Sequence, residues 1–113
     1  MSSFEKALNH ISEQIKEYRE TEQNDGESMT RILQQISSTL YYLEKERSVF
    51  HETFQKTIHK LVLSGESVSR AENQAHVIVP EMYLLRRVMD SGYKVCDSIR
   101  TQISWIKSGL QNN

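Results

Sequence analysis

Hydrophobic residues recur along two long stretches of the chain at alternating steps of three and four residues. The first run consists of Leu33, Ile36, Leu40, Leu43, Arg47, Phe50, Phe54, Thr57 and Leu61, with polar interruptions at two positions. The second run consists of Met82, Leu85, Met89, Gly92, Cys96, Ile99, Ile103, Ile106 and Leu110. A repeat that averages 3.5 residues is typical of the seam between the helices of a coiled coil. The pattern therefore predicts an all-α fold in which two long helices pack seam to seam.

Turn and capping signals divide the chain into four predicted helices. We expect an N-terminal helix over residues 1–22, a long helix over 28–64, a short helix over 67–78 and a second long helix over 80–110. Ser28 is a favoured N-cap for the first long helix, and Gly65 suits the position just after its end. Pro80 fits the first turn of the last helix. Such helices predict a single elongated domain, an antiparallel coiled-coil-like helical hairpin to which the N-terminal and short connecting helices are added.

Two further N-termini carry the spacing of a capping box. Ser2 lies three residues before Glu5, and Ser69 lies three residues before Glu72. Within the second run, Gly92 would cost roughly 1 kcal/mol relative to alanine in an isolated helix. We therefore expect a compensating contact there, either another helix in close approach or a large neighbour such as Phe50 or Phe54.

Many apolar side chains lie outside the two seams. They are Ile32, Tyr41, Tyr42, Val49, Ile58, Val62, Leu84, Val88, Val95 and Trp105. Two helices cannot bury all of them, and a broad apolar surface normally has a partner. The N-terminal helix should cover some, and the remainder predicts a homo-oligomer.

The overall composition narrows the classes of partner. Charged residues make up 26% of the 113 residues, and the formal net charge is −1. This balance argues against wholesale electrostatic binding to nucleic acid or to a membrane. No stretch approaches the roughly 20 apolar residues that span a bilayer, and the polar, periodic N-terminus does not resemble a signal peptide. We expect a cytoplasmic protein with no membrane partner.

No motif in the chain indicates catalysis. The sequence contains no GxSxG, GxxxxGK[ST] or GxGxxG motif, and its four histidines, His10, His51, His59 and His76, have no zinc-site spacing. The single cysteine, Cys96, falls on a seam position and is interpreted as a small buried hydrophobe rather than a nucleophile. The sequence predicts a protein that is not an enzyme and uses no cofactor and no metal.

Basic residues recur along the last helix at a helical spacing. Arg86, Tyr93, Arg100 and Lys107 lie seven residues apart, with Arg87 and Lys94 in a parallel line, and Lys56, Lys60 and Arg70 form a secondary group. In single-strand nucleic-acid sites, cations follow the phosphates while an aromatic ring stacks on a base. The alternative is a solvated face with ion pairs, because Asp90 lies four residues before Lys94 and Asp97 three residues before Arg100.

Residues of the last third resemble a known family. The segment over residues 81–107, with Ser98, Arg100, Ile103, Trp105 and Ile106, resembles the C-terminal helix of small helical phage recombination mediators of the UvsY type. The mid-chain Ser64-Gly65 is similar to a helix stop in that family. The family's mid-chain Lys-x-Arg cluster is replaced here by residues 57–59, Thr-Ile-His. The resemblance covers about 45 residues.

The resemblance implies a non-enzymatic role in DNA recombination or replication inside a bacterial host. Such a protein binds single-stranded DNA as an oligomer and helps to load a recombinase onto strands covered by a single-strand binding protein. The alternative is a protein-interaction module, such as an assembly adaptor, a chaperone or an inhibitor of a host enzyme, that binds no nucleic acid. The acidic N-terminal helix favours that alternative, because Glu13, Glu17 and Glu20 could face a basic surface.

Overall fold

The computed structural model describes residues 2–112, and it describes side chains as far as Gly109. The predicted seam residue Leu110 and the two terminal residues of the predicted domain therefore lie outside the described side chains. Four helices occupy this part of the chain: α1 (Ser3–Glu20), α2 (Gly26–Leu63), α3 (Val68–Ile78) and α4 (Glu81–Asn112). The described residues contain no strand. The predicted all-α class is therefore confirmed, and the molecule is elongated, with extents of 68 × 29 × 20 Å.

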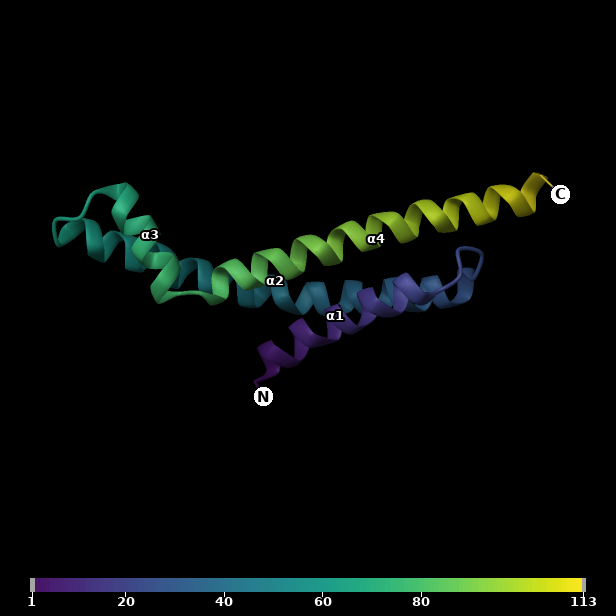
Figure 1. The fold of residues 1–113 in the computed structure, drawn as a ribbon, viewed down its shortest axis with the longest axis horizontal. Coiled ribbons are helices and arrows are strands. Elements are labelled where there is room, and N and C mark those ends of the chain that lie inside the picture. The colour runs from purple at the N-terminus through teal and green to yellow at the C-terminus, as the bar shows by residue number, and fades with distance from the viewer. Residues whose placement is uncertain (1, 113) are drawn as a thin grey trace.

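The two long helices lie side by side and run in opposite directions (Figure 1). α1 lies along both of them and runs antiparallel to α2, so that the middle of the molecule is a three-helix bundle (Figure 1). α3 folds back onto the C-terminal part of α2, at the end of the molecule away from the α1–α2 loop (Figure 1). No helix in the described part of the chain has the length and apolar character required to cross a bilayer.

Side-chain caps fix where three of the helices begin. The Ser2 hydroxyl accepts a hydrogen bond from the Glu5 amide at 3.1 Å, as the first capping box predicts. α2 begins two residues earlier than predicted, because the Asp25 carboxylate accepts from the Ser28 amide at 3.0 Å and takes the N-cap role assigned to Ser28. This hydrogen bond lowers the pKa of the Asp25 carboxyl.

The connection between α2 and α3 also departs from the expected caps. Gly65 adopts a φ of 106°, a left-handed conformation that favours glycine, so its placement just after α2 is correct. α3 is capped by Ser67, which accepts from the Arg70 amide at 3.3 Å, and not by the predicted Ser69. The backbone of Ser67 is extended, which is the conformation that an N-cap residue needs.

The main core lies where α1, α2 and α4 meet. Its buried members are Leu8, Ile11, Met29, Ile32, Ile36, Leu40, Leu43, Leu85, Met89, Cys96 and Ile99. Ile32 is fully buried although it lies outside the predicted seam, whereas the seam residue Leu33 is half-buried. The reason is that α1 covers the side of α2 on which Ile32 lies, so the buried face of α2 is wider than a two-helix seam.

Gly92 of α4 lies close to side chains of both α1 and α2. A Cβ atom at this position would come within 3.2 Å of a Leu40 methyl and within 3.5 Å of methyls of Ile11 and Ile36. The expected close approach is therefore present. The neighbours are aliphatic residues of α1 and α2, and not the expected Phe50 or Phe54.

A second, smaller cluster holds α3 in place. Its buried members are Phe54, Ala75, Val79 and Met82. Ala75 has no exposed surface, so its small side chain lets α3 lie close to α2. This packing brings α3 next to the start of α4 and to the C-terminal part of α2.

Candidate nucleic-acid interface

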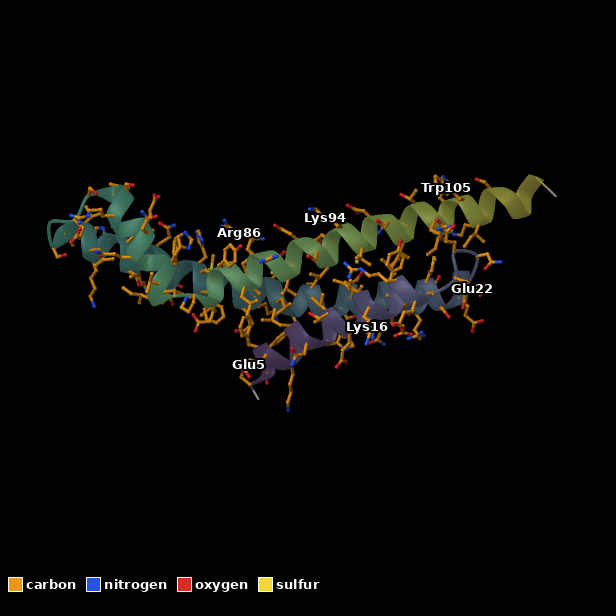
Figure 2. All side chains as sticks on the ribbon, in the orientation of Figure 1. Glu5, Lys16, Glu22, Arg86, Lys94 and Trp105 are labelled. Carbon is orange, nitrogen blue, oxygen red and sulfur yellow. The ribbon has the colours of Figure 1, made fainter. Side chains whose placement is uncertain are left out.

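All six predicted binding residues of α4 have substantial solvent exposure. They are Arg86, Arg87, Tyr93, Lys94, Arg100 and Lys107. Figure 2 shows Arg86 and Lys94 on the side of α4 that faces away from α1. Trp105 lies on this same side, whereas Glu5 and Lys16 lie on the α1 side of the molecule (Figure 2). Basic and aromatic side chains thus share the outer surface of α4.

Four residues on this surface form a narrow line. Tyr83, Lys94 and Trp105 lie at successive intervals of 11 residues, and Arg87 lies one turn after Tyr83. At 3.6 residues per turn these four positions fall within an arc of about 40° and extend over about 33 Å. We call these four residues the outer stripe.

Both rings of the outer stripe are free to meet a ligand. Tyr83 is 62% exposed and Trp105 is 67% exposed. The sequence pattern pointed to Tyr93 instead and did not include Tyr83 or Trp105. The signal that could have found them is the 11-residue spacing, which keeps positions on one face of a straight helix better than a spacing of seven.

Tyr93 has a different environment. Its hydroxyl donates a hydrogen bond to the Glu44 carboxylate of α2, and its ring lines a groove between α2 and α4 together with Tyr41 and Arg100. The hydrogen bond to Glu44, with burial and the carboxylate's charge, raises the pKa of Tyr93 to about 12. Tyr93 therefore joins two helices, and its ring lies beside α2.

This contact predicts a loss of stability at alkaline pH. The pKa of Tyr93 in the folded chain exceeds the ordinary value of about 10, so its stabilising effect is complete below pH 10 and is lost as the pH rises toward 12. Urea unfolding at about pH 9 and about pH 11.5 should show a smaller decrease in unfolding free energy for Tyr93→Phe than for the unmodified chain. Equal decreases in the two proteins would contradict this role of Tyr93.

Ion pairs account for some of the predicted basic residues. Arg100 pairs with Asp97 at 3.2 Å, as the solvated-face alternative predicts. Lys56 pairs with Glu52 at 3.0 Å, and Arg70 lies 4.0 Å from Glu66. All three are exposed pairs, which contribute little to stability and leave the cation accessible.

The other cations on α4 have no such partner. Among the described residues, Arg86, Arg87, Lys94 and Lys107 are in none of the ion pairs, and the predicted Asp90–Lys94 pair does not form. Of the two ion pairs that the solvated-face alternative predicts, Asp97–Arg100 is present and Asp90–Lys94 is absent. Two cations without ion-pair partners in the described part of the chain, Arg87 and Lys94, thus lie on the outer stripe, and the exposed Asp90 lies between them on the same helix face.

The nine predicted binding residues do not converge on one site. Lys107 lines an open groove with Gly26 and Arg31, near the α1–α2 loop. Lys56 and Lys60 lie together on the C-terminal part of α2, in the half of the molecule that also carries Arg70 of α3. The secondary group is therefore separate from the outer stripe.

The histidine, cysteine and acidic side chains of the described residues do not form a metal-binding group. Within residues 2–112, no three side chains of the histidine, cysteine, aspartate and glutamate classes are close enough to hold a metal ion. Cys96 is 1% exposed, and its burial raises the pKa of the thiol, which disfavours the reactive thiolate. The interpretation of Cys96 as a buried hydrophobe is confirmed.

Comparison of the chain with models of protein families, with curated proteins and with solved structures finds no match.

Proposed function

We propose that this chain is a non-catalytic binding protein that holds single-stranded nucleic acid along the outer stripe of α4. The observation that carries the proposal is the arrangement of Arg87 and Lys94 between the exposed rings of Tyr83 and Trp105 on one helix face. Each ring can stack on a base of any identity, while the cations contact phosphates. The sequence preference of such a site is low, because stacking does not read base edges.

The size of the site suits a short single strand and not a duplex. The stripe is straight and about 33 Å long, and its two rings face solvent, where unstacked bases can reach them. In a duplex the base faces are already stacked and only their edges are accessible. The resemblance of residues 81–107 to phage recombination mediators supports the same ligand and suggests that a recombinase or a single-strand binding protein is a partner.

The single tryptophan provides a direct test. An unlabelled oligothymidine should quench the fluorescence of Trp105 at roughly 50 mM salt, because a base stacks on the indole. With two phosphate contacts, from Arg87 and Lys94, affinity should decrease roughly 7-fold at 200 mM salt, since each contact to a single strand contributes a slope of about −0.7. Absence of quenching at 50 mM would contradict the proposal.

A second candidate function is supported by the end of the molecule where α2 meets α3. Leu63 is 74% exposed, Val68 59%, Val77 79% and Ile78 59%. Exposed apolar groups at this density favour contact with another protein. A protein-interaction module with no nucleic-acid ligand is therefore the alternative, and failure of oligonucleotide binding at both salt concentrations would favour it.

The acidic helix α1 contributes less to this alternative than its composition suggests. Glu17 forms an ion pair with Arg31 of α2, and the hydrogen bond from Arg31 lowers the pKa of the Glu17 carboxyl. Glu13 and Glu20 remain exposed. Glu17 thus holds α1 on α2, and two of the three acids are accessible to a basic partner.

We also propose that the chain self-associates through its exposed apolar residues. Sedimentation at micromolar concentration should then give a species heavier than the 13.2 kDa chain. A single species of monomer mass would contradict self-association. Each particle would then have one outer stripe to bind nucleic acid.

A further inference from the structure

A small cavity lies where α2, α3 and α4 meet, at the N-terminal end of the outer stripe. Its volume is about 90 Å³, enough for a few water molecules. Its floor is apolar, since Phe54 is 9% exposed and Met82 is 4% exposed. A cavity of this size accepts one small group and not a nucleobase.

The remaining walls are made of polar side chains that can donate hydrogen bonds. They are His51, Gln55, His76, Tyr83 and Arg86. α2 supplies the first two, α3 supplies His76, and α4 supplies Tyr83 and Arg86. An imidazole has an N–H donor in both its neutral and its charged form, and amide, phenol and guanidinium groups also donate.

No carboxylate lines the cavity. The acid next to it in sequence, Glu52, is paired with Lys56 at 3.0 Å, and Arg86 has no ion-pair partner among the described residues. Several donors from three helices thus surround a small space that contains a cation and lacks an anion.

We infer that this cavity binds a phosphate group. A tetrahedral oxyanion offers enough acceptor sites to satisfy donors that arrive from three directions, and the planar guanidinium of Arg86 can contact two of its oxygens. Packing between His76 and the Phe54 ring, whose centroids are 4.8 Å apart, holds the imidazole over the floor. We call this cavity the phosphate pocket.

The outer stripe indicates which molecule bears this phosphate, namely a nucleic-acid strand. This step rests on the proposed function. Tyr83 belongs both to the phosphate pocket and to the outer stripe. A terminal phosphate in the pocket would therefore belong to a strand whose next base can stack on Tyr83. An end phosphate fits this position, because the pocket lies beside Tyr83, the first residue of the outer stripe, and the rest of the strand can follow the stripe from there.

The four histidines allow the pocket to be tested with inorganic phosphate as the probe. The ring signals of His51 and His76 in the NMR spectrum should shift as phosphate is added. Both shifts should saturate with the same dissociation constant, on the order of millimolar. The signals of His10 and His59, which lie elsewhere on α1 and α2, should remain unchanged. Sodium chloride at equal ionic strength is the reference. Equal shifts of all four histidines, or no shift, would overturn the pocket.

Oligonucleotides with and without a terminal phosphate test the carrier. The unmodified chain should bind the phosphorylated strand roughly 3- to 10-fold more tightly than the unphosphorylated strand. His51→Gln/His76→Gln should remove this gain and keep the binding of the unphosphorylated strand, whereas His10→Gln/His59→Gln should keep both. A gain that persists in the first double variant would overturn the assignment.

The two proposals fail in different ways. If phosphate shifts His51 and His76 but no oligonucleotide binds, the pocket stands, the proposed function is wrong, and the carrier is a free phosphate or another phosphate ester. If oligonucleotides bind with no preference for a terminal phosphate and the rings do not respond to inorganic phosphate, the outer stripe stands and the pocket is wrong.

Discussion

Replacement of Gly92 by leucine should lower the free energy of unfolding by about 3 kcal/mol, the largest stability effect expected from a single change in this chain. The added Cβ alone would meet the Leu40 methyl at 3.2 Å, and the rest of the side chain has no space between Ile11 and Ile36. α1, α2 and α4 would have to separate, and the contacts of the main core would weaken along their length. Thermal unfolding followed by circular dichroism should show a decrease in Tm of roughly 10–20 °C.

Gly109→Leu is the matched control for this prediction. Gly109 also lies in α4, but a Cβ there would have no atom within 4 Å. The same chemical change should then leave Tm unchanged or raise it slightly, because leucine has the higher helix propensity. If both variants unfold at the same temperature, the close approach at Gly92 does not govern stability.

Removal of the outer stripe should produce the largest effect on binding. Trp105→Ala should weaken oligonucleotide binding about 5- to 150-fold, because one base loses its stacking partner. Arg87→Gln/Lys94→Gln should reduce the dependence of log affinity on log salt by about 1.4, since two phosphate contacts are lost. Fluorescence anisotropy of a labelled oligonucleotide measures both effects and does not depend on the tryptophan.

Three variants serve as controls for this prediction. Lys6→Gln/Lys16→Gln removes two charges from α1 and should leave the salt dependence unchanged, and Tyr42→Ala removes a ring from α2 and should leave affinity unchanged. Asp90→Asn should strengthen binding about 2- to 5-fold, because it removes an exposed negative charge within one turn of Arg87 and Lys94. Equal losses for the α1 and α4 double variants would show that binding depends on net charge and not on the stripe.

The hydrophobic repeat predicted the secondary structure well because its cause is local. Steps of three and four residues bury one face of any long helix, and helix ends are set by the left-handed backbone of Gly65 and by the side-chain hydroxyl of Ser2. The widths of the buried faces could not be predicted in this way. Ile32 belongs to the core that α1, α2 and α4 share, and that core joins residues far apart in sequence.

The candidate site was predicted in part. Charge periodicity identified Arg87 and Lys94 correctly as exposed cations on one helix. It could not show that Tyr93 is held by Glu44, because this contact depends on the register of α4 against α2. The phosphate pocket was not foreseen either, since its walls come from three helices and His76 reaches it only through the packing of α3.

The packing of α3 has one more consequence. α3 is held by a cluster that is separate from the main core, and Phe50 packs against both. Small independent clusters open more readily than the rest of a protein, so amide hydrogens of α3 should exchange with solvent sooner than those of α1. Each such opening would take His76 away from its neighbours while the three-helix bundle stays intact. A ligand bound at His76 would therefore slow the local unfolding of α3, and hydrogen exchange in α3 would respond to that ligand more than exchange elsewhere in the chain.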